Sequence, residues 1–494
     1  MPEDKIANKE LKRFGNEVLT LAGGTTIAQV VIALFSPVIS RLYSVSQIGV
    51  YSLFNSFVNV LGKVTCLRYE TTIPLPKEDE KAGNLFLVST IITIFFSTIL
   101  TIIVGLFGPN IFRLLNAEEL TPFGYLIPLA VLLQGIFLAV NYWETRKRRF
   151  KHLSKRRVTN SALTVIWQGA AAALGFGSVF NLIFGSVFGS LVANLQMLID
   201  MLRHDIQQIF GSFSLKDLIN DAKSYKEFPI YGIPAILLNS LSSNVPIFIL
   251  SFFFSTSIVG YYGFGFRVLR MPMDLIGVSI YQAFLPRAAQ AYKDGNLAWI
   301  VRFTYEKLIK ISFFPLAVIA FSGGPIFSLI FGDQWRIAGE YIQIMSLYVI
   351  FWFIANPISS LFSILNKQRS LLVFNIFNFI SRVISLSIGG LLSSERMAIL
   401  LYSISGIILY IMQNIVILKW AGIDARESIR TFLSSVIWPL LFASSMVLVT
   451  YITDNTIIIF SYFVVLICGY YFWLFSNDKE FKELFSFNPK EKNT

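Results

Sequence analysis

The chain has 494 residues, of which 55% are hydrophobic and 14% charged, with a mean hydropathy of +0.64 and a formal net charge of +12. A soluble domain carries about 25% charged residues, so this composition excludes a water-soluble globular protein of this size. In a soluble protein the positive charge would favour a nucleic-acid partner. Here the basic residues lie between apolar segments, and no nucleic acid is expected.

The N-terminus, from Met1 to Arg13, is polar and lacks the short apolar core and the small-residue cleavage site of a signal peptide, so we expect no processing. Apolar segments long enough to cross a bilayer then follow along the whole chain. Backbone groups in lipid must be hydrogen-bonded within their own segment, so each segment is predicted to be an α-helix. We therefore predict an all-α integral membrane protein of about 14 transmembrane helices. Their ranges are 15–40, 46–66, 83–107, 122–143, 159–177, 180–202, 228–254, 258–285, 304–331, 340–363, 371–392, 397–418, 432–452 and 457–475.

The basic residues between these segments predict the orientation. If residue 1 is cytoplasmic, about 31 Lys and Arg lie on the cytoplasmic side and about 4 outside, as the positive-inside rule requires. Both termini of this multi-pass membrane protein are therefore predicted to be cytoplasmic. The most basic stretch is ETRKRRFKHLSKRR, residues 144–157, which is predicted to be a stop signal that also binds anionic lipid headgroups. Contact of this stretch with cargo is the alternative.

Similar stretches recur in the same order and at a nearly constant offset in the numbering. SVSQIGVY at residues 44–51 resembles STSIVGYY at 255–262, GPNIFRLLN at 108–116 resembles GPIFSLIFG at 324–332, and LAVN at 138–141 resembles FIAN at 353–356. Internal repeats of this size are common in transporters. The repeat predicts two parallel six-helix lobes around a central cavity, followed by two additional helices. The corresponding division is an N-lobe (1–202), an inter-lobe linker (203–227), a C-lobe (228–418), two added spans (419–475) and a cytoplasmic tail (476–494).

Charged residues inside the predicted spans are candidates for a site, because burying a charge in the bilayer is costly. In the span 258–285, Arg267, Arg270 and Asp274 lie within about 60° of arc on one helical face. Their net positive charge suits an anionic ligand, although a salt-bridged contact between helices is the alternative. Lys307 and Lys310, in the first turns of their span, are expected to extend toward the membrane surface.

Five further charged residues are candidates. Lys63 corresponds to Asp274 in the second copy of the repeat. It is predicted to face a cavity, with extension to the surface as the alternative. Arg68 and Glu70 follow it as an interfacial pair or a functional one. Arg382 is an isolated cation inside its span, for which cargo binding and helix packing both remain open. Arg41 ends the first span on the outer side, as an anion contact or as an anchor.

The chemistry of an enzyme is missing from this sequence. The only cysteines, Cys66 and Cys468, lie in or beside apolar runs, and both histidines lie in basic loops. No nucleophile–base pair, metal-ligand cluster or phosphate-binding loop is present, so neither a cofactor nor a metal site is expected. The short outer loops disfavour a membrane glycosyltransferase or polymerase.

Four stretches together resemble a known family. They are SRLYSVSQIGVYSL (40–53), LRYETTIPLPKEDEKAGNL (67–85), NYWETRKRRFKHLSKRRV (141–158) and YGFGFRVLRMPMDLIGVSIYQAFLPRAA (262–289). Over roughly residues 10–420 the chain is similar to the O-antigen-type polysaccharide-biosynthesis flippases. These belong to the multidrug/oligosaccharidyl-lipid/polysaccharide exporter superfamily.

The resemblance implies a two-lobed bundle that moves polyprenyl-pyrophosphate-linked oligosaccharides to the outer leaflet, for O-antigen, lipopolysaccharide or capsule synthesis. It implies a cationic central cavity, with Arg267, Arg41 and Arg68 at the family's basic positions, and ion coupling through H⁺ or Na⁺, for which Asp274 and Glu70 are candidates. Membrane lipid and other polysaccharide-assembly proteins are the expected partners. Many members have 12 spans rather than 14. The runner-up is a multidrug/cation antiporter, which typically carries an acidic residue in its first span, whereas residues 18–40 contain none.

Overall fold

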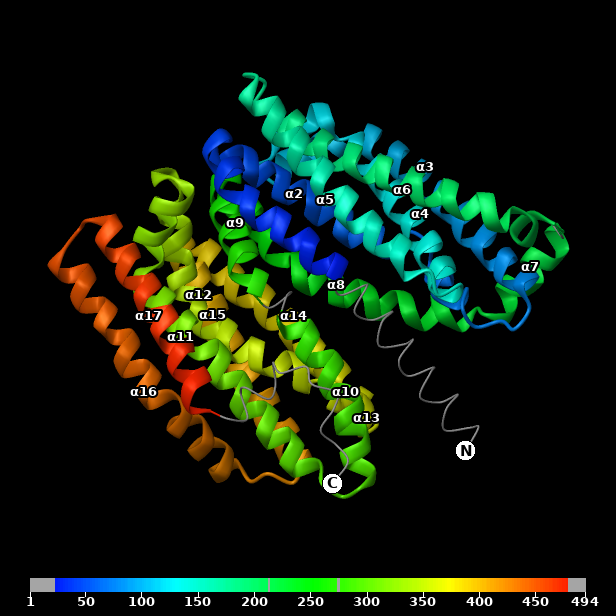
Figure 1. Ribbon diagram of the computed structural model, residues 1–494. Coiled ribbons are helices and arrows are strands. Elements are labelled where there is room, and N and C mark those ends of the chain that lie inside the picture. The colour runs from blue at the N-terminus through cyan, green and yellow to red at the C-terminus, as the bar shows by residue number, and fades with distance from the viewer. Residues whose placement is uncertain (1–22, 212–213, 273–275, 479–494) are drawn as a thin grey trace. The chain divides into compact units, whose positions relative to one another are not determined.

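The computed structural model describes residues 23–211, 214–272 and 276–478, and every regular element in these ranges is a helix (Figure 1). The all-α prediction is therefore confirmed. The first helix is Gly23–Leu42, and three short 3₁₀ helices are η1 (Tyr69–Thr72), η2 (Glu118–Phe123) and η4 (Asp333–Trp335). The α-helices are α2 (Val45–Gly62), α3 (Asp79–Leu114), α4 (Leu126–Arg146), α5 (Phe150–Ala173), α6 (Val179–Phe210), α7 (Leu215–Ser224), α8 (Glu227–Phe253), α9 (Thr256–Pro272), α10 (Val278–Lys293), α11 (Leu297–Phe331), α12 (Arg336–Ile358), α13 (Leu361–Ile364), α14 (Gln368–Leu391), α15 (Glu395–Trp420), α16 (Ala425–Ile452) and α17 (Thr456–Asn477).

Each predicted span overlaps at least one helix, but the number 14 is not confirmed. Eleven helices in the described ranges are long and apolar enough to cross a membrane. The helices α2, α5 and the pair α9 and α10 are not among them. The predicted span 258–285 overlaps both α9 and α10, and residues 273–275 between them lie outside the described ranges.

The chain divides into two compact units. Unit 1 comprises residues 1–271 and 375–398, and unit 2 comprises residues 272–374 and 399–494. The helices α8, α9 and most of α14 therefore cluster with the N-terminal helices. The division into lobes at residues 202 and 228 stays a prediction.

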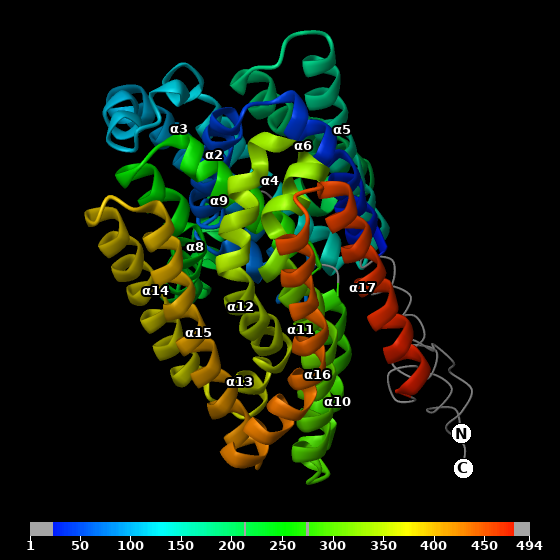
Figure 2. The same cartoon turned by 90° about the vertical axis from the view of Figure 1, so that its left-hand side faces the viewer.

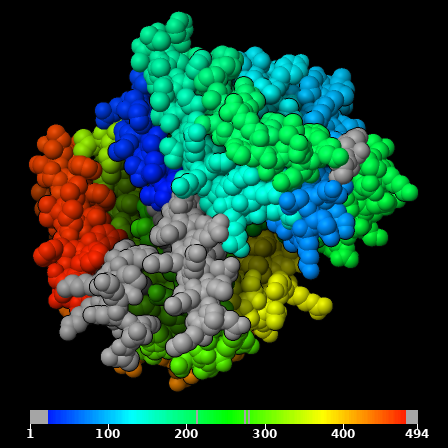
Figure 3. Space-filling model, turned by 45° about the vertical axis from the view of Figure 1, so that its right-hand side comes forward, coloured from blue at the N-terminus to red at the C-terminus, as the bar shows by residue number. Residues whose placement is uncertain are grey.

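In unit 1, several helices extend beyond the bilayer thickness. The 36 residues of α3 give a length of about 54 Å, against about 30 Å of hydrocarbon. The predicted linker 203–227 contains the last turns of α6 and the amphipathic helix α7. The linker is held to the bundle, because Asn84 donates to Asp221 at 2.8 Å and the Tyr69 hydroxyl donates to the Ala222 carbonyl at 3.1 Å. The blue and cyan surface in Figure 3 belongs to this unit.

The two copies of the predicted repeat meet within unit 1, where α2 packs on α9. A Cβ on Gly49 would lie 1.7 Å from the Thr256 carbonyl oxygen, and one on Gly260 would lie 2.2 Å from the Val45 carbonyl oxygen. Adding 211 to Val45 and Gly49 gives Thr256 and Gly260, so the two contacts are reciprocal. Such reciprocity is what a pseudo-two-fold axis between repeats produces, and only glycine permits so close an approach.

In unit 2, α11 packs against α12, α16 and α17 (Figure 2). Lys307 and Lys310 bind the Asp478 carboxylate at 2.7 and 3.1 Å, and the hydroxyl of Tyr470 donates to the Lys310 carbonyl at 2.8 Å. Lys307 is buried, and the carboxylate that both lysines bind lies just beyond the end of α17. These contacts fasten α17 to α11, and the extension of the two lysines to the membrane surface stays a prediction.

Candidate functional site

Three of the predicted cations come from α2 and α9 of unit 1. Lys63 is the C-terminal cap of α2 and is half-buried, while Arg267 and Arg270 are exposed on α9. Lys63 and Arg270 lie close enough for their charges to repel each other. The two cations thus gather positive charge at one place in the unit, which favours an anionic ligand between them.

Neighbouring contacts place Lys63 deep in the bundle. A Cβ on Gly62 would lie 2.8 Å from the Gln134 side chain, and one on Gly135 would lie 2.6 Å from the Thr65 side chain. Residues 134 and 135 are close to the middle of α4, which is long and apolar enough to span a membrane. Lys63 is therefore level with the middle of a span rather than with its end. Such a position is costly for a cation unless an anion or water accompanies it.

The chain between α2 and α3 is irregular and contains the pair Arg68 and Glu70. Leu67 and Arg68 both adopt left-handed backbone angles, with φ of 49° and 69°. Arg68 Nη1 lies 3.2 Å from Glu70 Oε1, and only 1% of the Glu70 side chain is exposed. Glu70 Oε2 has no hydrogen-bond partner among the described residues. Burial raises the pKa of Glu70, and the Arg68 charge opposes that shift.

The remaining candidates lie apart or outside the described ranges. Arg382, on α14, is buried and donates to the Ser242 carbonyl of α8 at 2.6 Å, which suits the helix-packing alternative. Arg41 is exposed at the end of the first helix. Asp274 lies outside the described residues. The structure thus brings together Lys63 with Arg270, and Arg68 with Glu70.

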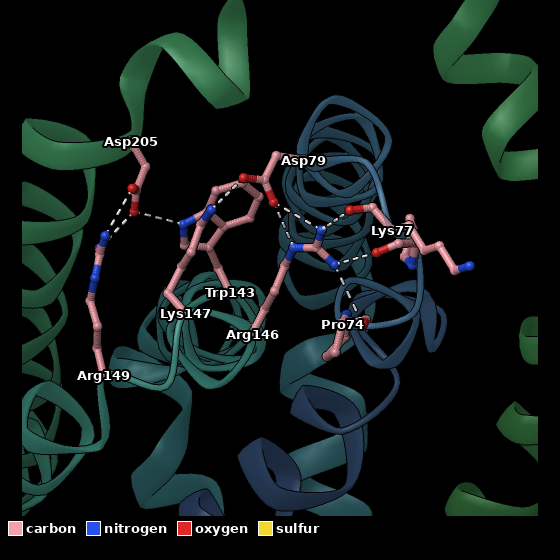
Figure 4. A network of polar contacts seen from close by, with 9 residues as sticks. Pro74, Lys77, Asp79, Trp143, Arg146, Lys147, Arg149 and Asp205 are labelled. Atoms are coloured by element: carbon pink, nitrogen blue, oxygen red, sulfur yellow. Dashed lines mark hydrogen bonds and ion pairs between the residues drawn. The ribbon is translucent and has the colours of Figure 1, made fainter. Parts of the chain in front are cut away.

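The basic stretch at residues 144–157 takes part in a polar network that composition did not reveal (Figure 4). Its first centre is Asp79, at the start of α3. Arg146 binds one oxygen of Asp79 through two nitrogens at 2.9 and 3.1 Å, and Lys147 binds the other oxygen at 2.7 Å. Arg146 also donates to the carbonyls of Pro74, Pro76 and Lys77, and so ties the α2–α3 connection to the end of α4.

The second centre of the network is Asp205, near the end of α6. Arg149 binds both Asp205 oxygens at 2.6 and 2.9 Å, and the Trp143 indole donates to the same carboxylate at 3.0 Å. Glu144, which is fully buried, accepts from Arg149 at 3.4 Å and lies 2.7 Å from His152 Nδ1. The Asp205 carboxylate raises the pKa of Arg149 further, so this pair stays charged.

These contacts correct the interpretation of the stretch as a headgroup anchor throughout. Arg146, Lys147 and Arg149 bind carboxylates of the protein, whereas Arg148 and Lys151 are exposed. We call the end of unit 1 that carries this network its basic end. Asp79 and Asp205 lie far from this stretch in the sequence. Only the presence of acidic residues near the ends of other helices could have indicated that the basic residues have carboxylate partners.

Metal binding finds no support in the part of the chain that the structure describes. No group of three or more His, Cys, Asp and Glu side chains is arranged there to hold an ion. The candidate residues are cations and the buried Glu70, one of whose oxygens has no hydrogen-bond partner among the described residues.

A family profile described as polysaccharide biosynthesis protein matches residues 38–340. No curated protein matches the chain. Among solved structures, "Lipid II flippase MurJ, inward closed conformation" superposes with a TM-score of 0.73 at 15% identity, covering 94% of this chain and 99% of that one.

More distant structures share the fold. An inward-facing multidrug resistance MATE family transporter of the MOP superfamily superposes with a TM-score of 0.58 at 14% identity, covering 82% of this chain and 94% of that one. A MOP superfamily transporter from Pyrococcus furiosus, described as having a binding pocket of reverse polarity, superposes with a TM-score of 0.54 at 16% identity, covering 82% of this chain and 95% of that one. At these identities the likeness establishes the fold alone.

Proposed function

Since the chain belongs to the polysaccharide biosynthesis protein family, we propose that it is a flippase for polyprenyl-pyrophosphate-linked oligosaccharides. It moves them from the cytoplasmic to the outer leaflet of the bacterial inner membrane, by alternating access of two lobes. The shared fold with a lipid II flippase supports this assignment, because the cargo of that protein is itself a lipid. The products then serve O-antigen, lipopolysaccharide or capsule synthesis, together with other polysaccharide-assembly proteins.

The observation that carries the proposal is that Lys63, whose neighbours contact the middle of α4, lies near the positive charge of Arg270. Lys63 and Arg270 repel each other, so an anion that binds between them is attracted by both charges. A pyrophosphate that crosses the bilayer needs such compensation, because an unpaired charge in hydrocarbon is strongly disfavoured. Arg267 and Arg270 offer planar forks for phosphate oxygens, and Lys63 offers a compact charge. Arg68, Arg41 and Arg382 are candidate further contacts along the path.

Ion coupling is assigned to Glu70, with Asp274 as the second candidate. The free oxygen and deep burial of Glu70 suit a carboxyl that alternates between a proton and Arg68. A cargo phosphate that draws Arg68 away would favour protonation of Glu70, and release of cargo would reverse it. H⁺ is therefore the favoured coupling ion, with Na⁺ as the alternative.

Substitution of Arg267 tests the proposal. Arg267→Ala removes a charged fork from the cargo phosphate, worth about 1.5–3 kcal/mol, and should slow translocation roughly ten- to 150-fold. Arg267→Lys returns the charge without the fork and should restore only part of the rate. The measurement is the amount of lipid-linked sugar on each leaflet, at equal protein levels.

Lys155→Ala is the matched control, because Lys155 is an exposed cation at the basic end and should be dispensable. Normal export by Arg267→Ala and by Arg270→Ala would place the cargo site elsewhere.

The second candidate is a multidrug or cation antiporter, which the MATE fold favours. Such a protein needs a negative site for its cation. The first helix, Gly23–Leu42, contains no acidic residue, and the paired charges described above are positive. Drug resistance conferred by overexpression, without any effect on lipid-linked sugar, would favour the antiporter.

A further inference from the structure

A cavity of about 260 Å³ lies within unit 1, between α2, α3, α4 and α8. Every residue that lines it is apolar or glycine. Three phenylalanine rings line the cavity. The ring of Phe57 makes edge-to-face contacts with Phe248 and Phe112, at centroid distances of 5.1 and 6.1 Å. Water has no hydrogen-bond partner in such a space, so the cavity suits hydrocarbon.

The cavity opens on the lipid-exposed face of α3. Ile103, which lines it, is 41% exposed, and its neighbours Ile102 and Leu106 are 57% and 68% exposed. The α3 helix is long and apolar enough to span the membrane. An apolar space that borders lipid tails is filled by one of them, because an empty cavity forfeits the contacts of its lining atoms.

The walls of this cavity are fastened at the end opposite the basic end. The Asn116 amide, just beyond α3, donates to the carbonyls of Ser251, Phe252 and Phe254 at 3.0–3.2 Å. These carbonyls belong to the end of α8 or follow it, where a helix has unpaired acceptors. The bonds hold the ends of α3 and α8 together and preserve the space between them.

The depth of the cavity identifies which lipid fits. At one end the lining includes Ile127, at the start of α4. At the other end it includes Leu61, whose neighbour Gly62 contacts Gln134 near the middle of α4. Lys63, two residues further, interacts with Arg270. A resident phospholipid keeps its phosphate at the membrane surface, about half a bilayer away from such cations. Only a lipid whose phosphate crosses the bilayer places that phosphate beside Lys63 and its tail in the cavity.

The size of the cavity is compatible with part of a polyprenyl chain. A cavity of about 150 Å³ holds benzene with its six carbons, so 260 Å³ corresponds to about ten carbons, or two isoprene units. Methyl-branched, unsaturated units also suit an irregular wall of phenylalanine rings, which present both faces and edges.

We propose that this cavity binds the polyprenyl tail of the cargo, with about two isoprene units between α2, α3 and α8 while Lys63 and Arg270 hold the phosphate. The inference rests on the proposed function for the identity of the lipid. It adds a tail site on unit 1, toward the outer leaflet, to the phosphate site.

Photolabelling of the full-length protein in nanodiscs tests the proposal. The probe is a polyprenyl monophosphate with a diazirine on the second isoprene unit from the phosphate. We expect labelled peptides from α2, α3 and α8. Val104→Trp, which fills the cavity from its lining, should reduce this labelling about tenfold, equivalent to about 1.4 kcal/mol. Ile102→Trp, on the exposed face of the same helix, should leave it unchanged.

Two further measurements keep the test independent of folding. Leu241→Trp fills the same cavity from α8 and should act like Val104→Trp, in protein whose melting temperature is unchanged. In unaltered protein, phosphatidylglycerol with a diazirine in its acyl chain should label the cavity weakly and be displaced by polyprenyl phosphate. Strong phosphatidylglycerol labelling that resists displacement would show an ordinary lipid site and overturn the proposal.

Failure of this inference and failure of the proposed function give different results. Absence of probe from the cavity, while Arg267→Ala still blocks export, would refute the tail site and leave the flippase assignment standing. Labelling of the cavity that Val104→Trp abolishes, combined with normal export by Arg267→Ala and Arg270→Ala, would retain the tail site and refute the function assigned to these arginines.

Discussion

The reciprocal contact between α2 and α9 predicts that alanine is not tolerated at either glycine. Real Cβ atoms essentially never approach another heavy atom within 3.0 Å, whereas the added Cβ would lie at 1.7 Å in Gly49→Ala and at 2.2 Å in Gly260→Ala. Both variants therefore require the helices to separate, and Gly49→Ala requires the larger separation. Both obstacles are backbone carbonyls, which cannot rotate away as side chains do.

Overpacking of this kind costs about 1–3 kcal/mol, with Gly49→Ala expected near the upper end and Gly260→Ala near the lower end. Because either methyl group separates the same pair of helices, the double variant should cost less than the sum of the single ones. Gly169→Ala and Gly469→Ala are matched controls, since a Cβ at these positions meets nothing within 4 Å. The controls should be neutral or stabilised by up to about 1 kcal/mol.

The thiol of Cys66 offers a direct assay. Cys66 is buried and Cys468 is exposed, so in a Cys468→Ser background a thiol-reactive dye reports unfolding of unit 1. The apparent melting temperature, at one fixed heating rate, should fall further for Gly49→Ala than for Gly260→Ala. Equal melting temperatures for Gly49→Ala and Gly169→Ala would refute the close packing of α2 on α9.

Two further predictions concern carboxylates of unit 1. Asp205→Asn leaves Arg149 without its bidentate partner and should cost about 2–3 kcal/mol, measured as a lower melting temperature, while Asp217→Asn on the exposed face of α7 should not. Burial raises the pKa of Glu70 above its usual 4.5, so its contribution to stability is present below that value and is lost as pH rises through the raised pKa. Glu70→Gln should therefore flatten the pH dependence of the melting temperature above pH 4.5, and an unchanged profile would contradict the assignment.

The helices were predictable from sequence because crossing a bilayer requires a long apolar run, and such runs are visible locally. Their ends were less predictable. The α3 helix begins at Asp79 rather than near residue 83 and continues past Pro109, since its polar turns outside the hydrocarbon carry no apolar signal. The candidate cations were equally visible, because a charge inside an apolar run stands out.

The partners of those charges could not be predicted, because they depend on which helices meet. Arg149 and Asp205 are 56 residues apart, and nothing local in either segment indicates the other. The same holds for Arg382, for which the sequence left cargo binding and helix packing open, and whose guanidinium donates to a carbonyl of α8. The match between residues 44–51 and 255–262 was visible in the sequence, whereas the direct contact between these two segments was found only in the structure.

The ion pairs of the basic end also bear on the predicted orientation. Arg146, Lys147 and Arg149 are compensated in the folded protein, which at first sight removes them from the basic excess that sets topology. Topology, however, is decided during insertion, when Asp79 and Asp205 on other helices have not yet met these cations, and acidic residues contribute little to it. The whole excess of basic residues should therefore determine the orientation of the chain.

Reporter fusions after Lys155 and Phe487 should both be cytoplasmic, and a fusion after Glu118 should be external. An external reporter at Phe487 would mean an odd number of spans and refute the placement of both termini in the cytoplasm.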